Sequence, residues 1–125
     1  MRLLLDSHTL LWWMDDPSRL GLAAQQAISD PANLVFASAV SVWELGLKSS
    51  KGKLRLPLGF HRMLRENGIE PLAFTAEHAV ESISLPAIHG DPFDRALVAQ
   101  CRMASMTLAT RDGMLGGYGI AILPV

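Results

Sequence analysis

Four carboxylates occupy positions in this sequence where acidic residues are unusual. Asp6 ends the apolar run RLLL, and Asp112 follows the apolar segment TLAT. Glu44 and Asp94 lie beside apolar residues within helix-like stretches. Three or four carboxylates at close range cannot all stay ionised without a cation. Oxygen ligands without cysteine favour Mg²⁺ or Mn²⁺ over zinc, and such an ion can activate water and stabilise charge on a phosphodiester. The four residues therefore indicate phosphoryl transfer.

Most of these carboxylates also have a structural explanation. Glu44 can pair with Lys48 one helical turn later, and Asp94 can simply favour the positive end of a helix dipole. Asp112 begins an Asp-Gly pair, which is common in turns. Asp6 has the weakest structural explanation, because it directly ends a predicted buried strand. Considered together, the four residues favour a metal site.

Asp91 is predicted to have a different role. It precedes a proline that suits the first position of a helix, so its carboxylate is expected to accept a hydrogen bond from an amide of the first turn. Asp94 follows three residues later on the helical face of Leu97 and Val98, where a carboxylate is costly unless a positive charge meets it.

An aspartyl-phosphate hydrolase is a competing enzyme class. Such enzymes also place an aspartate after the first strand, usually with a second aspartate two positions later. Here His8 stands at that second position. The sequence disfavours this class without excluding it.

The elements that must position these residues alternate along the chain. Strands are predicted from short, nearly continuous apolar or β-branched segments, at residues 2–5, 34–37, 107–110 and 121–123. Helices are predicted between them from their start signals, at 17–29, about 39–49, from Thr75 onward, and 92–104, and residues 10–14 are predicted to lie on a short first helix. This order predicts a single α/β domain over residues 1–125, with three layers and a parallel sheet. Because ligands of such sheets bind beyond the carboxyl ends of the strands, Asp6 and Asp112 are expected to meet in one crevice.

Composition and charge exclude several other classes. Half of the 125 residues are apolar and 18% are charged, which supports one folded core and excludes a disordered chain. The net charge of −1 excludes a uniformly basic surface for nucleic acids. The single cysteine, Cys101, fits a reducing compartment. Neither a signal peptide nor a membrane span is predicted, so the expected location is the cytoplasm, with no membrane partner.

Positive charge is nevertheless concentrated in one segment. Six of the eleven basic residues lie there: Lys48, Lys51, Lys53, Arg55, Arg62 and Arg65. A polyanion lying across the candidate metal site would have its phosphates neutralised by this segment. An ordinary solvated face explains the segment equally well.

Other residues near the acids have open interpretations. Residues 10–14 are five consecutive large apolar residues, which contact either another chain or two sides of this small domain. His8 and His89 are predicted to form hydrogen bonds or contact substrate rather than to bind metal. Arg95 and Arg111 neighbour the acids and are predicted to balance their charge.

The chain as a whole resembles PIN-domain ribonucleases, and among them the VapC-like toxins of bacterial toxin–antitoxin pairs. The resemblance rests on four motifs in the right order, LLLDSHTLLWW, SAVSVWELGLKSSKGKL, HGDPFDRALVAQ and LATRDGML. It implies a three-layer α/β/α PIN-like fold with a central, mostly parallel sheet. It also implies a Mg²⁺-dependent endoribonuclease, a cognate antitoxin whose tail occupies the site, and a homodimer.

The resemblance also implies roles for individual residues. The family's four acids match, in chain order, Asp6, Glu44, Asp94 and Asp112. Asp6 and Asp94 would coordinate the essential ion, and Asp112 would complete the shell or place a second ion. Glu44 would bind metal or orient the attacking water. Attack of water in line would leave a 5′-phosphate and a 3′-hydroxyl on a structured RNA, such as a transfer or ribosomal RNA.

Supporting positions match as well. Asp91 corresponds to the cap position, and Thr110 corresponds to a hydroxyl that supports the site. The residues expected to contact RNA are Lys48, Lys51, Lys53 and Arg55.

A second hypothesis belongs to another class of function. The same fold could act mainly as a binding module in an antitoxin or repressor complex, with weak or absent catalysis and with the acids gripping an arginine of the antitoxin. Affinity for Mg²⁺ separates the two hypotheses, because a binding module need not lose that affinity when Asp6 is neutralised.

Overall fold

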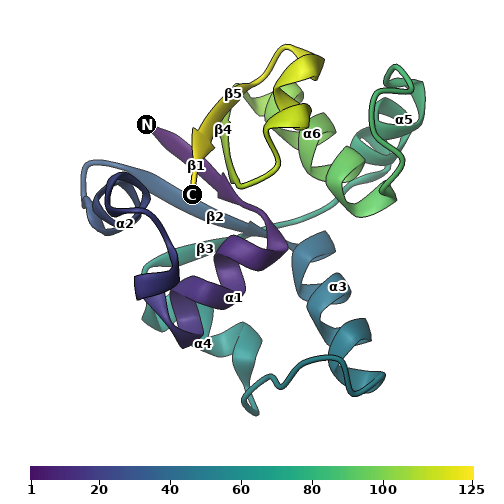
Figure 1. Cartoon of the computed structure of the whole chain (residues 1–125). Coiled ribbons are helices and arrows are strands. Elements are labelled where there is room, and N and C mark those ends of the chain that lie inside the picture. Colours follow the sequence, from purple (N-terminus) through teal and green to yellow (C-terminus); the bar gives the residue numbers. More distant parts are fainter.

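Five parallel strands form the centre of the structure, a computed structural model that describes residues 1–125 (Figure 1). The strand order is β3-β2-β1-β4-β5, and every neighbouring pair is parallel. The strands are β1 (Arg2–Leu5), β2 (Leu34–Ser38), β3 (Ile69–Leu72), β4 (Thr107–Thr110) and β5 (Ala121–Pro124). Helices cover both faces of the sheet (Figure 1), which confirms the predicted α/β/α architecture.

Strand β3 is an element that the sequence did not predict. It pairs with β2 at the edge of the sheet, where Ile69 lies opposite Val35. Of its four residues only Ile69 is buried, and the strand contains Glu70 and Pro71. A proline has no amide hydrogen to donate to a neighbouring strand. It is tolerated in an edge strand, because such a strand has a neighbour on one side only. The half-exposed edge therefore lacks the continuous apolar pattern of the inner strands.

The helices follow the predicted alternation with two differences. Their bounds are α1 (Ser7–Asp15), α2 (Leu22–Ser29), α3 (Ala39–Ser50), α4 (Phe60–Glu66), α5 (Ala76–Ser84) and α6 (Pro92–Ala104), with the 3₁₀ helices η1 (Pro17–Arg19) and η2 (Gly113–Tyr118). The helix predicted over 17–29 was wrong as a single element, because the extended backbone at Gly21 separates η1 from α2. Helix α4 was not predicted. None of these helices has the length and apolar character needed to cross a membrane.

Alternation along β1 divides the core into two layers. Leu3 and Leu5 face one side of the sheet, where the buried cluster includes residues of α1, α2 and α4. Leu4 faces the other side, with residues of α6 and η2. All three leucines are completely buried. Complete burial on both faces explains why the strand reads as a continuous apolar run.

Short connections place helix starts directly at the carboxyl edge of the sheet. Asp6 follows β1 and caps α1, and Ser38 ends β2 and caps α3. The amide of Asp6 donates to the Ala109 carbonyl at 3.1 Å, which joins the ends of β1 and β4. Helix α3 packs against both α1 and α6 at this edge. Residues far apart in the sequence therefore meet there.

Candidate active site

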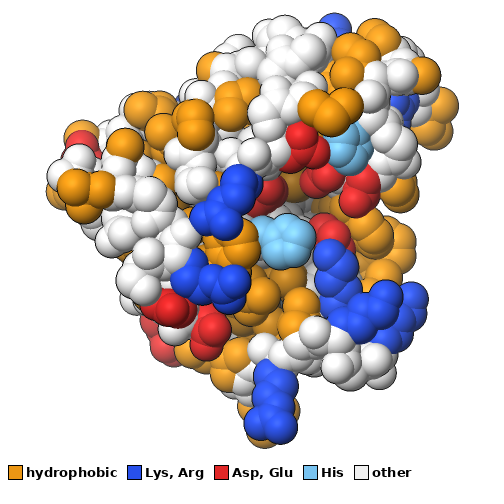
Figure 2. All heavy atoms as spheres, viewed as in Figure 1, with side chains coloured by type: hydrophobic (Ala, Val, Ile, Leu, Met, Phe, Trp, Pro, Cys, Tyr) orange, Lys and Arg blue, Asp and Glu red, His pale blue; other side chains and the backbone are white.

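A cleft of about 340 Å³ opens at the carboxyl edge of the sheet. Its walls are strongly charged, and the carboxylates that line it are Asp6, Glu44, Asp91, Asp94 and Asp112. Figure 2 shows acidic side chains gathered in a hollow, with basic side chains on either side. We call this feature the acidic cleft. The tertiary structure thus brings all four acids singled out in the sequence to one place.

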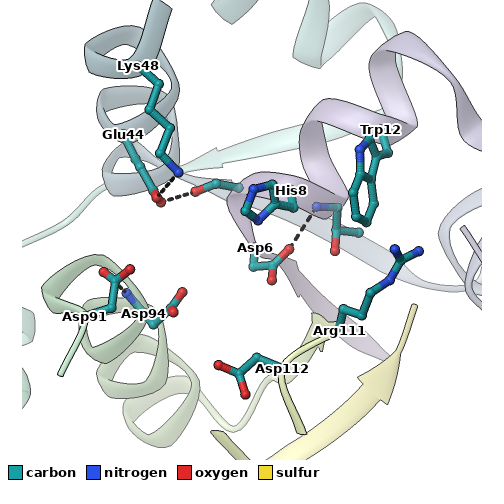
Figure 3. A pocket seen from close by; sticks show the side chains of 11 residues that line it. Asp6, His8, Trp12, Glu44, Lys48, Asp91, Asp94, Arg111 and Asp112 are labelled. Carbon is teal, nitrogen blue, oxygen red and sulfur yellow. Dashed lines mark hydrogen bonds and ion pairs between the residues drawn. The ribbon is translucent and has the colours of Figure 1, made fainter. Parts of the chain in front are cut away.

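Asp6 is held rigidly at the centre of the acidic cleft (Figure 3). Its Oδ1 accepts a hydrogen bond from the Thr9 amide at 2.9 Å, and its Oδ2 accepts one from Thr110 Oγ1 at 2.6 Å. Each carboxylate oxygen has a further lone pair, so Asp6 remains able to bind a cation. Thr110 is only 1% exposed, and its hydroxyl orients Asp6 as a supporting residue would.

Asp94 differs from the other acids because no hydrogen-bond donor reaches its carboxylate. The nearest ionisable nitrogen, His89 Nε2, lies 3.7 Å from Asp94 Oδ2. Burial, together with the nearby charges of Asp91, Asp6 and Glu44, raises the pKa of Asp94 to about 7 against the opposing effect of His89. A carboxyl group in these surroundings ionises readily only when a cation joins it. The helix dipole alone does not account for its position.

His89 and Asp112 form a second linked pair at the cleft. The His89 Nδ1 accepts from the Asp91 amide at 3.1 Å, so the proton of the neutral ring lies on Nε2. This Nε2 lies 2.8 Å from Asp112 Oδ2 and donates to it. Ligand atoms of His89, Asp94 and Asp112 all lie within 4.8 Å of one another. In this tautomer His89 orients Asp112, and its Nε2 would have to lose this proton before it could bind a metal ion.

Asp112 also has the turn role that its Asp-Gly pair indicated. Its Oδ1 accepts from the Met114 amide at 3.0 Å and caps η2. The Asp112 amide donates to Thr110 Oγ1 at 3.1 Å. The turn therefore points the remaining oxygen of Asp112 toward the cleft, and the structural and the chemical interpretation of this residue are compatible.

Glu44 makes the predicted ion pair and still lines the cleft. Its Oε2 pairs with Lys48 Nζ at 2.8 Å, and its Oε1 accepts a hydrogen bond from the hydroxyl of Ser7. Glu44 is 7% exposed. Ser7 was not predicted as a site residue. The sequence feature that could have indicated it is a hydroxyl directly after Asp6, which is also common at ordinary helix starts.

Asp91 lies at the N-cap of α6, as predicted. Its Oδ1 accepts from the Phe93 amide at 2.8 Å and from the Asp94 amide at 3.4 Å. This carboxylate fixes the first turn of α6 and so sets the direction of Asp94.

The predicted charge-balancing role of Arg95 is wrong. Its guanidinium donates to four backbone carbonyls and to the Tyr118 hydroxyl, and no carboxylate pairs with it. The carbonyls belong to Ser82, Leu85, Pro86 and His89. Arg95 therefore ties the segment before α6 to its first turn.

We expect Arg95→Ala to lower the free energy of unfolding by about 2–3 kcal/mol, because several carbonyls lose a charged donor. Urea unfolding followed by circular dichroism measures this change. Arg95→Lys should recover little stability, because an ammonium group cannot reproduce the planar set of donors. Full recovery by lysine would contradict this interpretation.

The basic and apolar segments are only partly at the cleft. Of the residues expected to contact RNA, Lys48 lines the acidic cleft, whereas Lys51, Lys53 and Arg55 lie on the exposed segment after α3.

In the apolar run 10–14, Leu10 is buried and the other four residues are partly buried against the core. Internal packing thus accounts for the run.

The donor set of the acidic cleft fits a divalent cation. Asp6, Asp94 and Asp112 line the same cleft, in which ligand oxygens of Asp94 and Asp112 lie within 4.8 Å of each other, and no Lys or Arg pairs with any of the three. Hard cations such as Mg²⁺ prefer oxygen ligands of this kind. The donor-free carboxylate of Asp94 is the feature that most clearly requires a positive partner.

The fold and the acidic cleft together define a known class of protein. The chain matches the PIN domain family over residues 3–118, and it belongs to this family. It is 33% identical over 119 residues to Ribonuclease VapC22 of Mycobacterium tuberculosis, covering 92% of this chain and 90% of that protein.

Solved structures support the same fold. VapBC2 from Rickettsia felis, bound to a promoter DNA fragment, matches with a TM-score of 0.72 at 13% identity, covering 99% of this chain and 98% of that one. The DNA-bound VapBC from Salmonella typhimurium matches with a TM-score of 0.70 at 14% identity, with the same coverage.

Proposed function

We propose that this protein is a Mg²⁺-dependent endoribonuclease that acts as the toxin of a toxin–antitoxin pair. Its substrate is a structured cellular RNA, such as a transfer or ribosomal RNA. The observation that carries the proposal is the set of converging carboxylates in a PIN-domain cleft, with Asp94 lacking any donor. The similarity to a VapC ribonuclease supports the same activity.

Each residue of the acidic cleft has a role in this proposal. Asp6 and Asp94 would hold the ion, with Asp112 completing the site directly or through water; Mn²⁺ could replace Mg²⁺. A bound divalent ion supplies charge stabilisation on the phosphodiester and lowers the pKa of water. Glu44, held between Ser7 and Lys48, orients the attacking water. His89 keeps Asp112 in place.

The decisive experiment is cleavage of total cellular RNA by the purified, antitoxin-free protein with and without Mg²⁺. New 5′ ends are mapped by sequencing. Discrete ends that require Mg²⁺ and carry a 5′-phosphate would support the proposal and name the target. Ends that persist in EDTA would contradict the metal-dependent mechanism.

The alternative, a binding module without significant catalysis, makes a different prediction about Mg²⁺. We expect Asp6→Asn to weaken Mg²⁺ binding at least about tenfold, because a ligand is lost. Isothermal titration calorimetry measures this affinity. Unchanged Mg²⁺ affinity in the variant, together with no RNA cleavage by the unaltered protein, would favour the binding module.

An antitoxin partner fits a second cavity, of about 550 Å³, beside α3, α4 and β3. Val42, Leu64 and Leu72 form its apolar lining, and Arg62 and Arg65 add positive charge. An amphipathic segment with acidic residues complements this surface. The VapBC structures named above, which are toxin–antitoxin complexes, support such a partner.

A homodimer would cover the exposed apolar side chains of α3 and α5. Trp43 is 61% exposed and Ile83 is 80% exposed, and both line a groove with Phe74 and Phe93. Val80, on α5, is also largely exposed. Apolar residues gathered in this way mark protein interfaces.

We expect Ile83→Glu to weaken this dimer at least about 100-fold, because a charge would be buried without a partner. Sedimentation equilibrium measures the dissociation constant. Met103→Glu is the matched control, since Met103 is an exposed residue of α6 outside this groove. A dimer of unchanged strength in Ile83→Glu would place the interface elsewhere.

A further inference from the structure

Trp12 carries two arginine side chains on its indole ring. The guanidinium carbon of Arg111 lies 4.2 Å from the ring centroid, and that of Arg19 lies 4.9 Å from it. The ring of His8 lies 5.7 Å from Trp12, tilted by 31°. These side chains come from α1, η1 and the segment after β4. We call the set of His8, Trp12, Arg19 and Arg111 the arginine wall.

The arginine wall borders the acidic cleft. His8, Trp12 and Arg111 line the cleft together with the acids. Figure 3 shows Trp12 and Arg111 on one side of Asp6, and Lys48 on the other. In Figure 2, basic side chains accordingly stand on both sides of the hollow. The cleft therefore has an acidic floor between two positive walls, and the proposed function uses only one of these walls.

The guanidinium groups of the arginine wall are held in place but not neutralised. Arg111 donates through Nη2 to the Arg19 carbonyl at 2.7 Å and through Nε to the Val125 carbonyl at 3.2 Å. Neither Arg19 nor Arg111 pairs with an Asp or Glu side chain, and the Arg19 side chain makes no hydrogen bond within the chain. Stacking on an indole orients a guanidinium while its edge stays free for an anion. Such preorganisation reduces the entropic cost of binding.

We infer that the arginine wall binds the RNA strand on the side of the scissile phosphate opposite Lys48. This inference rests on the proposed function and names a second contact surface for its substrate. The Arg19 and Arg111 guanidiniums bind backbone phosphates, a contact that is frequently bidentate. The flat faces of His8 and of the guanidiniums stack on unpaired bases. The substrate strand then crosses the acids from one positive wall to the other.

Two features favour RNA over an acidic protein segment as the occupant. An RNA strand that crosses the acids enters the cleft on one side and leaves it on the other. The arginine wall lies on the side opposite Lys48. The carboxylates of an acidic peptide could bind the edges of the guanidiniums. They have no planar ring to stack on the flat faces of His8 and of the guanidiniums. RNA uses both, because each nucleotide carries a phosphate and a planar base.

The test is the salt dependence of RNA affinity. Fluorescence anisotropy of a short, fluorescein-labelled, single-stranded RNA of mixed sequence measures binding in EDTA, where metal-dependent cleavage is blocked. Arg19→Ala and Arg111→Ala should each weaken binding about tenfold, and each should lower the slope of log affinity against log salt by about 0.7. Trp12→Ala should weaken binding at least as much, because it removes the ring on which both guanidiniums stack.

Arg102→Ala is the matched control, since Arg102 is an exposed arginine of α6 whose Nε lies 3.7 Å from a Glu81 carboxylate oxygen. Its affinity and salt slope should equal those of the unaltered protein. Arg19 is exposed, so its replacement tests the inference even if Trp12→Ala proves unstable.

The outcomes separate this inference from the proposed function. Mg²⁺-dependent RNA cleavage by the unaltered protein, together with unchanged affinity and slope in Arg19→Ala and Arg111→Ala, would overturn the inference alone. Failure of the unaltered protein to bind or cleave RNA would overturn both. Loss of affinity for a polyglutamate peptide, with RNA affinity unchanged, would assign the arginine wall to an acidic protein segment and overturn the inference.

Discussion

Asp94→Asn is expected to slow Mg²⁺-dependent RNA cleavage by at least about 100-fold, because changes in residues that merely support a metal ligand already cost 10–100-fold. Asparagine has nearly the same shape but cannot supply the negative charge that holds a cation. The Asp94 carboxylate accepts no hydrogen bond in the folded protein, so the substitution breaks none, and its nearest ionisable partner is His89 Nε2 at 3.7 Å. The rate of appearance of a mapped 5′ end, at saturating Mg²⁺, measures the effect.

The control for this experiment is Asp30→Asn. Asp30 is an exposed aspartate after α2, and its Oδ1 accepts from the Ala32 amide. Asparagine keeps that acceptor, so cleavage should proceed at the original rate. Cleavage by Asp94→Asn at the rate of the unaltered protein would show that Asp94 is not part of the reacting site.

Asp94→Asn should also remove a pH dependence from the stability of the metal-free protein. The pKa of Asp94 is raised from 3.8 to about 7 in the folded state. Between these values the folded protein keeps a proton that the unfolded chain has released. The free energy of unfolding therefore decreases as pH rises, by up to about 1.4 kcal/mol per pH unit for this one group. The decrease ends above the folded pKa of about 7, where both states are ionised.

Urea unfolding in EDTA, from about pH 5 to about pH 8, measures this effect as the difference between the unaltered protein and Asp94→Asn. That comparison cancels the contribution of the histidines that lie away from Asp94. The variant should be the more stable of the two at the alkaline end. Mg²⁺ should stabilise the unaltered protein more at the alkaline end than at the acidic end, because it binds the ionised carboxylates. Parallel pH profiles for the two proteins would contradict the raised pKa of Asp94.

The inner part of the fold was predictable from local pattern. Strands β1, β2 and β4 carry apolar runs because helices cover both faces of the inner sheet, and the edge strand β5 carries the apolar run AIL although it is only partly buried. Caps at Ser38, Thr75 and Asp91 marked the starts of α3, α5 and α6. Strand β3 and helix α4 escaped prediction, because a half-exposed edge strand and a seven-residue helix leave weak periodic signals. These elements depend on packing for their stability.

The candidate site, too, has features that the sequence predicts and features that depend on the tertiary structure. The sequence by itself determined which residues could do the chemistry, since Asp6 and Asp112 follow apolar strand segments whose ends must share one edge of a parallel sheet. It also determined that Asp91 caps a helix. These conclusions need only the neighbouring residues, because capping and strand burial are local properties of the chain.

Only the tertiary structure decided how these residues are used. The raised pKa of Asp94 depends on its burial and on the charges of Asp91 and of Asp6, which lies on a different segment. The stacking of Arg111 on Trp12 exists because β1 and β4 are neighbours in the sheet. Such contacts join residues roughly a hundred positions apart, and the order of the strands, which no local pattern specifies, brings them together.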